Sequence, residues 1–167
     1  TENIRTNTNA TFLQNINVGV AITAGKLGIG FTDAHIKIGN TALDSLTTGT
    51  NNTAVGNNAL TADTTGSNNT AVGRDALTST TTGSENTAVG SKALDANTDG
   101  TENTAVGFNC LSDLTTGAHN TAIGHDALEN VTTGNYNTAM GRDAGRNITT
   151  GGVNLCIGHN SNDAANT

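Results

Sequence analysis

The chain has 167 residues and a formal net charge of −7, with 13% charged residues, 2% aromatic residues and no proline. Thr, Asn and Gly supply 32, 25 and 21 residues, nearly half of the chain. A conventional globular core of this size needs more large apolar side chains, and a disordered chain usually carries a higher net charge and an irregular sequence. We therefore expect one architectural unit that is stabilised by regular repetition.

The acidic balance also limits the partners. The isoelectric point is about 4.7, and the seven Lys and Arg residues are scattered along the chain. Nucleic acid and anionic membranes attract clustered basic residues, so we expect neither as a partner. No apolar run approaches the ~20 residues that span a bilayer, so we expect no membrane insertion. Because the chain begins at Thr1 without a basic and apolar leader, we expect a processed product or a segment of something longer.

Residues 1–35 precede the repeats and predict two β-strands. The first is an alternating apolar pattern, and a second alternating stretch follows a turn at Ala24-Gly25. These strands have two interpretations, capping of the first coil or pairing with another subunit. The candidate inter-subunit residues are those of the first pattern: Ile16, Val18, Val20 and Ile22.

Residues 36–158 repeat with a period of 17, without an insertion. The motif Thr53-Ala54-Val55-Gly56 recurs at every step, and the consensus reads T-A-V-G-x-N/D-A-L-x-x-x-T-T-G-x-x-N. There are seven full repeats and a partial eighth, and residues 159–167 form a polar tail or cap. A fixed period of this kind predicts stacked structural units.

Two glycine columns mark the corners of the unit. We expect a tight turn with positive φ at each of them, because a Cβ would clash there. The segments between corners have five or six residues, which is the length of a strand. We therefore predict an all-β fold, a parallel β-solenoid of seven to eight 17-residue coils, with ~4.8 Å per coil and roughly 40 Å overall. The columns are Gly39, Gly56, Gly73, Gly90, Gly107, Gly124, Gly141 and Gly158, and Gly49, Gly66, Gly83, Gly100, Gly117, Gly134 and Gly151.

Two apolar columns and one amide column are predicted to stack along the axis as a core ladder and an Asn ladder. The first apolar column is Ile38, Val55, Val72, Val89, Val106, Ile123, Met140 and Ile157, and the second is Leu43, Leu60, Leu77, Leu94, Leu111 and Leu128. The Asn ladder is Asn52, Asn69, Asn86, Asn103, Asn120, Asn137 and Asn154.

Two alanine columns stand beside these apolar columns, as at Ala54 and Ala59. If the Val and Leu columns point inward, strand alternation places the alanines outward. Small apolar residues on an outer face suit the close approach of another chain, which favours a homotrimer or other lateral assembly. The alternative, that Ala fills a narrow corner of the coil, has equal weight.

The T-A-V-G, A-L and T-T-G repeats of residues 36–158 resemble those of phage and giant-virus tail-fibre-like proteins and of some bacterial surface proteins. Gly28-Ile29-Gly30-Phe31-Thr32 is similar to the segment that precedes such arrays. A weaker likeness is to the head of trimeric autotransporter adhesins, a left-handed parallel β-roll with a shorter period. These resemblances imply a fibrous extracellular or virion appendage, and the weaker one implies a trimer.

The residues that commonly carry chemistry have mainly structural interpretations. Cys110 and Cys156 lie three coils apart, about 14 Å, so we predict buried thiols without an intrachain bridge, an interchain bridge being the alternative. His125 and His159 share a column but lie two coils apart, too far to bind one zinc directly, and we expect exposed histidines. We predict no metal and no cofactor.

Asp and Asn exchange in the column beside the first turn, as at Asn58 and Asp75, which favours turn capping over calcium binding. Threonine columns beside the second glycine, as at Thr47 and Thr64, favour ladder hydrogen bonds, with an ice-binding face as the alternative. No catalytic motif stands out, and we predict that the chain is not an enzyme.

Two functions fit these expectations, one on a virus particle and one on a cell surface. The first is a structural fibre or shaft component of a virion appendage involved in host attachment. The second is a bacterial or archaeal surface adhesin or extracellular filament subunit, assembled through its N-terminal strands and coil ends. In both, we expect an extracellular homo-oligomer, a trimer or an end-to-end fibre, that engages a host-surface receptor or glycan. The ligand, the viral or cellular origin, the handedness and the subunit number stay open.

Overall fold

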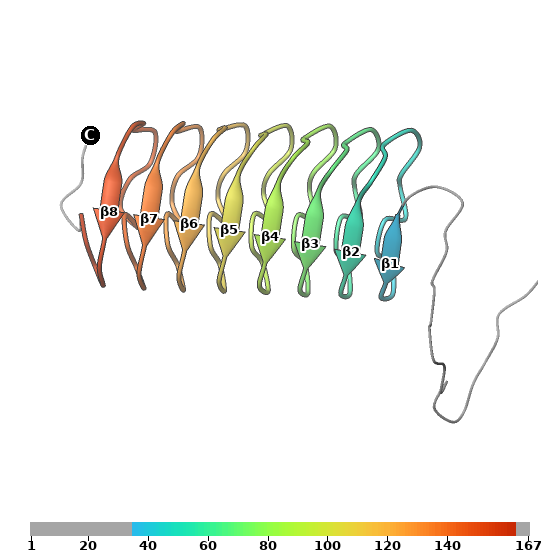
Figure 1. Ribbon diagram of the computed structural model, residues 1–167, viewed down its shortest axis with the longest axis horizontal. Coiled ribbons are helices and arrows are strands. Elements are labelled where there is room, and N and C mark those ends of the chain that lie inside the picture. Colours follow the sequence, from blue (N-terminus) through green and yellow to red (C-terminus); the bar gives the residue numbers. More distant parts are fainter. Residues whose placement is uncertain (1–34, 163–167) are drawn as a thin grey trace, which may run out of the picture.

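The computed structural model describes residues 35–162, and these form a parallel β-solenoid. Eight strands lie in one sheet in chain order, and Figure 1 shows them in a row along the long axis. Each strand pairs in parallel with the strand 17 residues later, so Val55 lies beside Val72. The strands are β1 (Ile36–Ile38), β2 (Thr53–Val55), β3 (Thr70–Val72), β4 (Thr87–Val89), β5 (Thr104–Val106), β6 (Thr121–Ile123), β7 (Thr138–Met140) and β8 (Leu155–Ile157).

The all-β parallel solenoid with 17-residue coils is thus confirmed, with about seven turns. We number the coils 1 to 8 from the strand that begins each, and positions 1 to 17 from that strand's first residue. Each coil has one three-residue strand, shorter than the segments expected from sequence, and the rest of the coil consists of turns and bends. The turns also hydrogen-bond from coil to coil: Leu60 N donates to Ala76 O at 3.1 Å and Thr64 N to Thr81 O at 3.0 Å. Backbone hydrogen bonds therefore join each coil to its neighbours around most of its length.

The strand alternates as expected, but its phase is the reverse of the prediction. Position 2 points inward: Ala54, Ala71, Ala88, Ala105 and Ala122 are fully buried. Position 3, assigned to the core from sequence, lies on the outer face, partly exposed at Val55, Val72 and Val106 and more exposed at Ile38, Val89, Ile123, Met140 and Ile157. The prediction of a buried Val column is therefore wrong. Of the two interpretations of the alanine columns, the outward position is wrong and the filling of a narrow part of the coil is confirmed.

The reason is the thinness of the interior. The buried Cys110, at position 7, lies 3.2 Å from the carbonyl oxygen of Ala122 at position 2 of the next coil. A side chain as small as that of cysteine thus already reaches the backbone of the next coil across the interior, so an inward Val has no room. Position 7 is accordingly alanine in the other coils that carry the full repeat, and Ala59, Ala76 and Ala93 are fully buried there.

Leucine at position 8 fills the widest part of the interior. The buried column is Leu43, Leu60, Leu77, Leu94, Leu111 and Leu128. Each of these leucines has a left-handed backbone, with φ between 50° and 53°. Such a conformation is costly for a residue with a Cβ, so burial of the leucine side chain has to offset it.

Glycine is required for a different reason in each of the two glycine columns. In the first, represented by Gly90, φ is about 142° and a Cβ would also overlap the carbonyl oxygen of Gly107 in the next coil. In the second, represented by Gly100, φ is not in the left-handed region, so the expectation of positive φ is wrong for this column. Glycine is needed there because a Cβ would meet the Gly117 carbonyl and the Asn97 side chain.

The Asn column at position 17 forms a continuous buried ladder. Asn103 Nδ2 donates to Asn86 Oδ1 at 3.2 Å and to Gly117 O at 2.8 Å, while its Oδ1 accepts from the backbone N–H of Asn120 at 2.9 Å. The ladder starts with a different residue, because Asn52 N donates to Nδ1 of His35 at 3.1 Å. His35 thus takes the place of an asparagine in the preceding position 17.

Candidate interaction surfaces

The outer face of the sheet is an uncharged strip made by positions 1 and 3 of every coil. Position 1 is threonine from β2 to β7, and position 3 is the aliphatic column described above. The strip is most exposed at its ends, where Leu155 is 71% and Ile157 65% exposed. We call positions 1 and 3 of β1 to β8 the sheet face. An uncharged, partly aliphatic face of this length on a chain with a net charge of −7 is typical of a contact surface.

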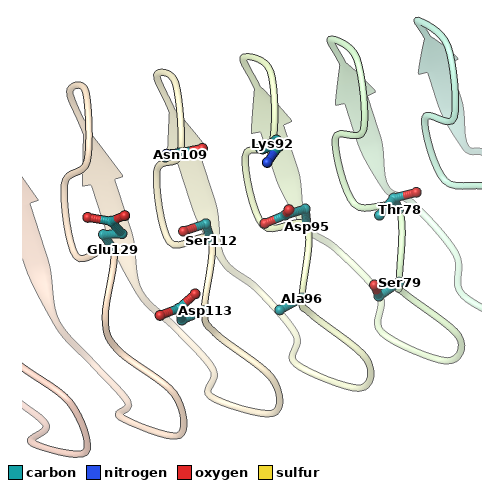
Figure 2. Close-up of a pocket in the computed structure, with 9 residues that line it drawn as sticks. All are labelled: Thr78, Ser79, Lys92, Asp95, Ala96, Asn109, Ser112, Asp113 and Glu129. Atoms are coloured by element: carbon teal, nitrogen blue, oxygen red, sulfur yellow. The ribbon is translucent and has the colours of Figure 1, made fainter.

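A polar groove lies elsewhere on coils 3 to 6, formed by the turns on either side of the leucines. It has a volume of about 390 Å³, and Figure 2 shows its side chains on successive coils. The carboxylates of Asp95, Asp113 and Glu129 line it with a single ammonium, that of Lys92. Burial raises the pKa of Asp95, and Lys92 opposes the shift. The groove therefore disfavours anionic ligands.

Aromatic rings lie at positions 5 and 16 of coils 5 and 6. The rings of His119 and Tyr136 are stacked, with centroids 4.8 Å apart, and Tyr136 is 59% exposed. The rings of Phe108 and His125 lie 5.1 Å apart and are tilted. These rings occupy neighbouring coils and offer flat faces of the kind on which sugar rings stack.

The threonine column at position 12 serves the backbone. The hydroxyl of Thr64 donates to Thr81 O at 3.0 Å, and that of Thr115 donates to Thr132 O at 3.0 Å. The same bond joins Thr47 to Thr64 at 2.8 Å. These hydroxyls link adjacent coils, in keeping with ladder hydrogen bonding.

Both cysteines are free and buried. Burial raises the pKa of the Cys110 thiol to about 12, so this thiol is unreactive at neutral pH. Cys156 stands in the strand-centre column, at the place of the inward alanine. The two thiols fill space that alanine occupies in other coils.

One buried column was missed by the sequence analysis because its residues change character along the axis. Position 11 carries the fully buried Asp63, Thr80 and Asn97 in coils 2 to 4 and the fully buried Leu114, Val131 and Ile148 in coils 5 to 7. The Asp63 carboxylate accepts from Gly66 N at 2.8 Å and Asn52 Nδ2 at 3.2 Å. Its burial raises its pKa to about 6. A column that changes from polar to apolar residues partway along the axis gives no consistent hydrophobic signal, and only its register in the repeat marks it.

The terminal coils replace interior apolar residues with polar ones. Position 2 of coil 1 is Lys37, which pairs with Asp44 at 2.7 Å, and positions 7 and 8 of coil 8 are Ser161 and Asn162. The candidate inter-subunit residues Ile16, Val18, Val20 and Ile22 lie outside the described residues.

In comparisons with known proteins, no family model, no curated protein and no solved structure matches the chain. Within residues 35–162, no helix has the length and apolar character needed to cross a membrane.

Proposed function

We propose that the chain is a shaft segment of an extracellular fibre, in a virion appendage that contributes to host attachment. The observation that carries the proposal is the unbroken register of eight parallel strands along one axis. Backbone ladders, the Asn ladder and the leucine column all run in this direction. Such a rod is stiff, resists proteolysis and holds another part of an assembly at a distance.

We further propose that copies of the chain associate side by side through the sheet face. A surface with a 17-residue period along a straight axis is matched best by a surface with the same spacing, which is a second copy of this chain. Positions 1 and 3 carry only threonine, aliphatic residues and Met140 from β1 to β8, so copies meet there without burying charge. The polar residues Lys37, Ser161 and Asn162 in the terminal coils favour lateral over end-to-end contact.

Sedimentation velocity of the purified chain tests the assembly. We expect a trimer or another small oligomer, and Val89→Glu in the middle of the sheet face is expected to shift it to monomer. The matched control is Ala96→Glu, which adds the same charge to the polar groove and is expected to leave the oligomer intact. A monomeric wild-type chain, or an oligomer that persists in Val89→Glu, would contradict lateral assembly.

Immunogold electron microscopy with antibodies against the purified chain tests the setting. Label on the fibres of virus particles supports the virion appendage. Label on filaments of the cell surface supports the alternative, an adhesin or filament subunit that uses the same rod. Label confined to the cell interior would contradict both.

A further inference from the structure

Three side chains with metal-binding atoms come together on coils 6 and 7, beside the first turn. His125 and Asp126 occupy positions 5 and 6 of coil 6, and Asp143 occupies position 6 of coil 7. Asp143 N donates to His125 O at 2.9 Å, which fixes the two coils in register at this point. One ligand atom from each side chain lies within 4.8 Å of the other two. Among residues 35–162, this is the one group of three or more His, Cys, Asp or Glu side chains with such proximity.

Asp126 supplies a second, independent observation. The residue is only 7% exposed, and its Oδ2 lies 2.9 Å from Nδ1 of His125. Its other oxygen, Oδ1, is buried and has no hydrogen-bond partner. A buried carboxylate oxygen without a donor is costly. Two groups can satisfy it: a bound cation, or the amide of Asn109, whose own Oδ1 in the same column of coil 5 is also buried without a partner.

We propose that His125, Asp126 and Asp143 bind a divalent first-row transition metal ion, with zinc as the ion that this donor set favours. Calcium and magnesium take oxygen ligands, whereas an imidazole nitrogen combined with carboxylates is typical of zinc. In a tetrahedral zinc site with bonds of about 2.1 Å, two ligand atoms lie about 3.4 Å apart, so side-chain rotations that shift these atoms by about 1–1.5 Å bring them into coordination. The distance between His125 and His159 had argued against zinc, but the two carboxylates provide ligands that the histidine pair alone lacks.

Two guanidinium groups compete for Asp143. Arg142 Nε lies 3.2 Å from Asp143 Oδ2, and Arg146 Nη1 lies 3.4 Å from Asp143 Oδ1. The Arg142 side chain is 66% exposed, so it leaves the carboxylate at little cost. Arg146 Nε also lies 2.5 Å from Glu129 Oε2. Arg146 therefore keeps an ion-pair partner when the metal binds Asp143.

The site lies where the leucine column ends. Position 8 of coil 7 is Gly145 instead of leucine, so the aliphatic ladder stops at Leu128. A metal ion bound by coils 6 and 7 joins these coils just where the apolar contact weakens. The imidazole of His159, in coil 8, has its Nε2 3.8 Å from Asp143 Oδ2 and extends the cluster to the last described coil.

Isothermal titration calorimetry of tag-free, chelator-treated protein with zinc chloride tests the proposal, with cobalt absorbance as a second readout. We expect one zinc per chain and a higher melting temperature with zinc. Asp143→Asn, Asp126→Asn and His125→Ser are each expected to weaken zinc binding about tenfold or more. These replacements suit the fold, because the same columns already hold Asn58, Asn109 and Ser91.

Asp75→Asn is the matched control, since Asp75 has the same position in coil 3 but stacks between Asn58 and Lys92. We expect it to leave zinc binding unchanged, and we expect Arg142→Ser to tighten binding by removing a competing cation. The proposal is overturned if zinc does not bind at millimolar concentration, if Asp143→Asn binds as well as the wild type, or if calcium binds this site in preference to zinc.

Discussion

The Oδ1 atom of Asn103 accepts two hydrogen bonds from Asn120, one from its backbone N–H at 2.9 Å and one from its Nδ2 at 3.0 Å. Both asparagines are fully buried. One side chain thus satisfies the backbone and the side chain of its counterpart in the next coil, while its own Nδ2 reaches the Gly117 carbonyl. The amide is the one side-chain group of this size with a donor and an acceptor to fill both roles.

Asn103→Ala is therefore expected to destabilise the solenoid strongly. The substitution leaves the Asn120 N–H and the Gly117 carbonyl without partners in a buried environment, at about 1–3 kcal/mol for each group. Urea unfolding followed by circular dichroism measures the loss. Asn130→Ala removes an asparagine that lies outside the ladder and is only half-buried, and it is expected to change the free energy of unfolding by less than about 0.5 kcal/mol. Equal effects of the two substitutions would contradict the role of the ladder.

The glycine at position 4 has two separable requirements, positive φ and the absence of a Cβ. Gly90 and Gly158 both have positive φ, at 142° and 112°, but a Cβ at Gly90 overlaps the backbone of Gly107 whereas a Cβ at Gly158 meets nothing within 4 Å. Gly158→Ala is expected to cost about 1–3 kcal/mol from backbone strain alone. Gly90→Ala adds a clash between coils and is expected to cost several kcal/mol more or to prevent folding.

Thermal unfolding of the two glycine variants, together with their yield of soluble protein, measures the difference. Similar melting temperatures for Gly90→Ala and Gly158→Ala would show that strain alone explains the glycine column.

The period of 17 residues was sufficient to predict the solenoid, because residues that recur at a fixed interval stack only when the coils lie in register. The same period predicted the leucine and asparagine columns, which the structure places in the interior. It did not predict which side of the three-residue strand points inward, since alternation gives the pattern without its phase. Hydrophobicity favoured Val55 over Ala54, and the thin interior reverses this choice.

Variation along the repeats carries the missing signal. Position 2 is alanine in coils 2 to 7, whereas position 3 changes from Val to Ile123 and Met140. A buried site between two close walls tolerates one size, and an outer site tolerates several. The site at His125, Asp126 and Asp143 could not be predicted from variation along the columns, because its residues occur together only in coils 6 and 7.

The strand phase predicts opposite effects for two adjacent residues. Ala105→Val adds two methyl groups to the thin interior and is expected to cost about 1–3 kcal/mol or more through overpacking. Val106→Thr places a hydroxyl on the outer face, where neighbouring strand residues are already threonine, and is expected to cost less than about 1 kcal/mol. Urea unfolding at low protein concentration measures both. If Val106→Thr lowers the free energy of unfolding more than Ala105→Val does, Val106 and not Ala105 points into the interior.

The buried carboxyl group of Asp63 is expected to make the chain less stable as the pH rises, the opposite of a salt-bridged carboxylate. Its pKa of about 6 in the folded chain lies above the usual 3.8, so the folded state binds more protons than the unfolded chain between these values. The contribution of Asp63 to the free energy of unfolding is therefore highest below about pH 3.8, and it falls as the pH rises through 6. Asp63→Asn is expected to gain on the order of 2–3 kcal/mol at pH 7.5 and almost nothing at pH 4. Asparagine suits the column, because Asn97 occupies the same position two coils away.

Chemical unfolding of the wild type and Asp63→Asn across pH 4 to 8 measures this dependence. Glu85→Gln, at an exposed carboxylate outside the buried column, is the matched control and is expected to retain the fall in stability that Asp63 causes. If Asp63→Asn has the same pH profile as the wild type, the buried carboxylate is ionised without cost, and its two hydrogen bonds from Gly66 and Asn52 are then sufficient to stabilise the charge.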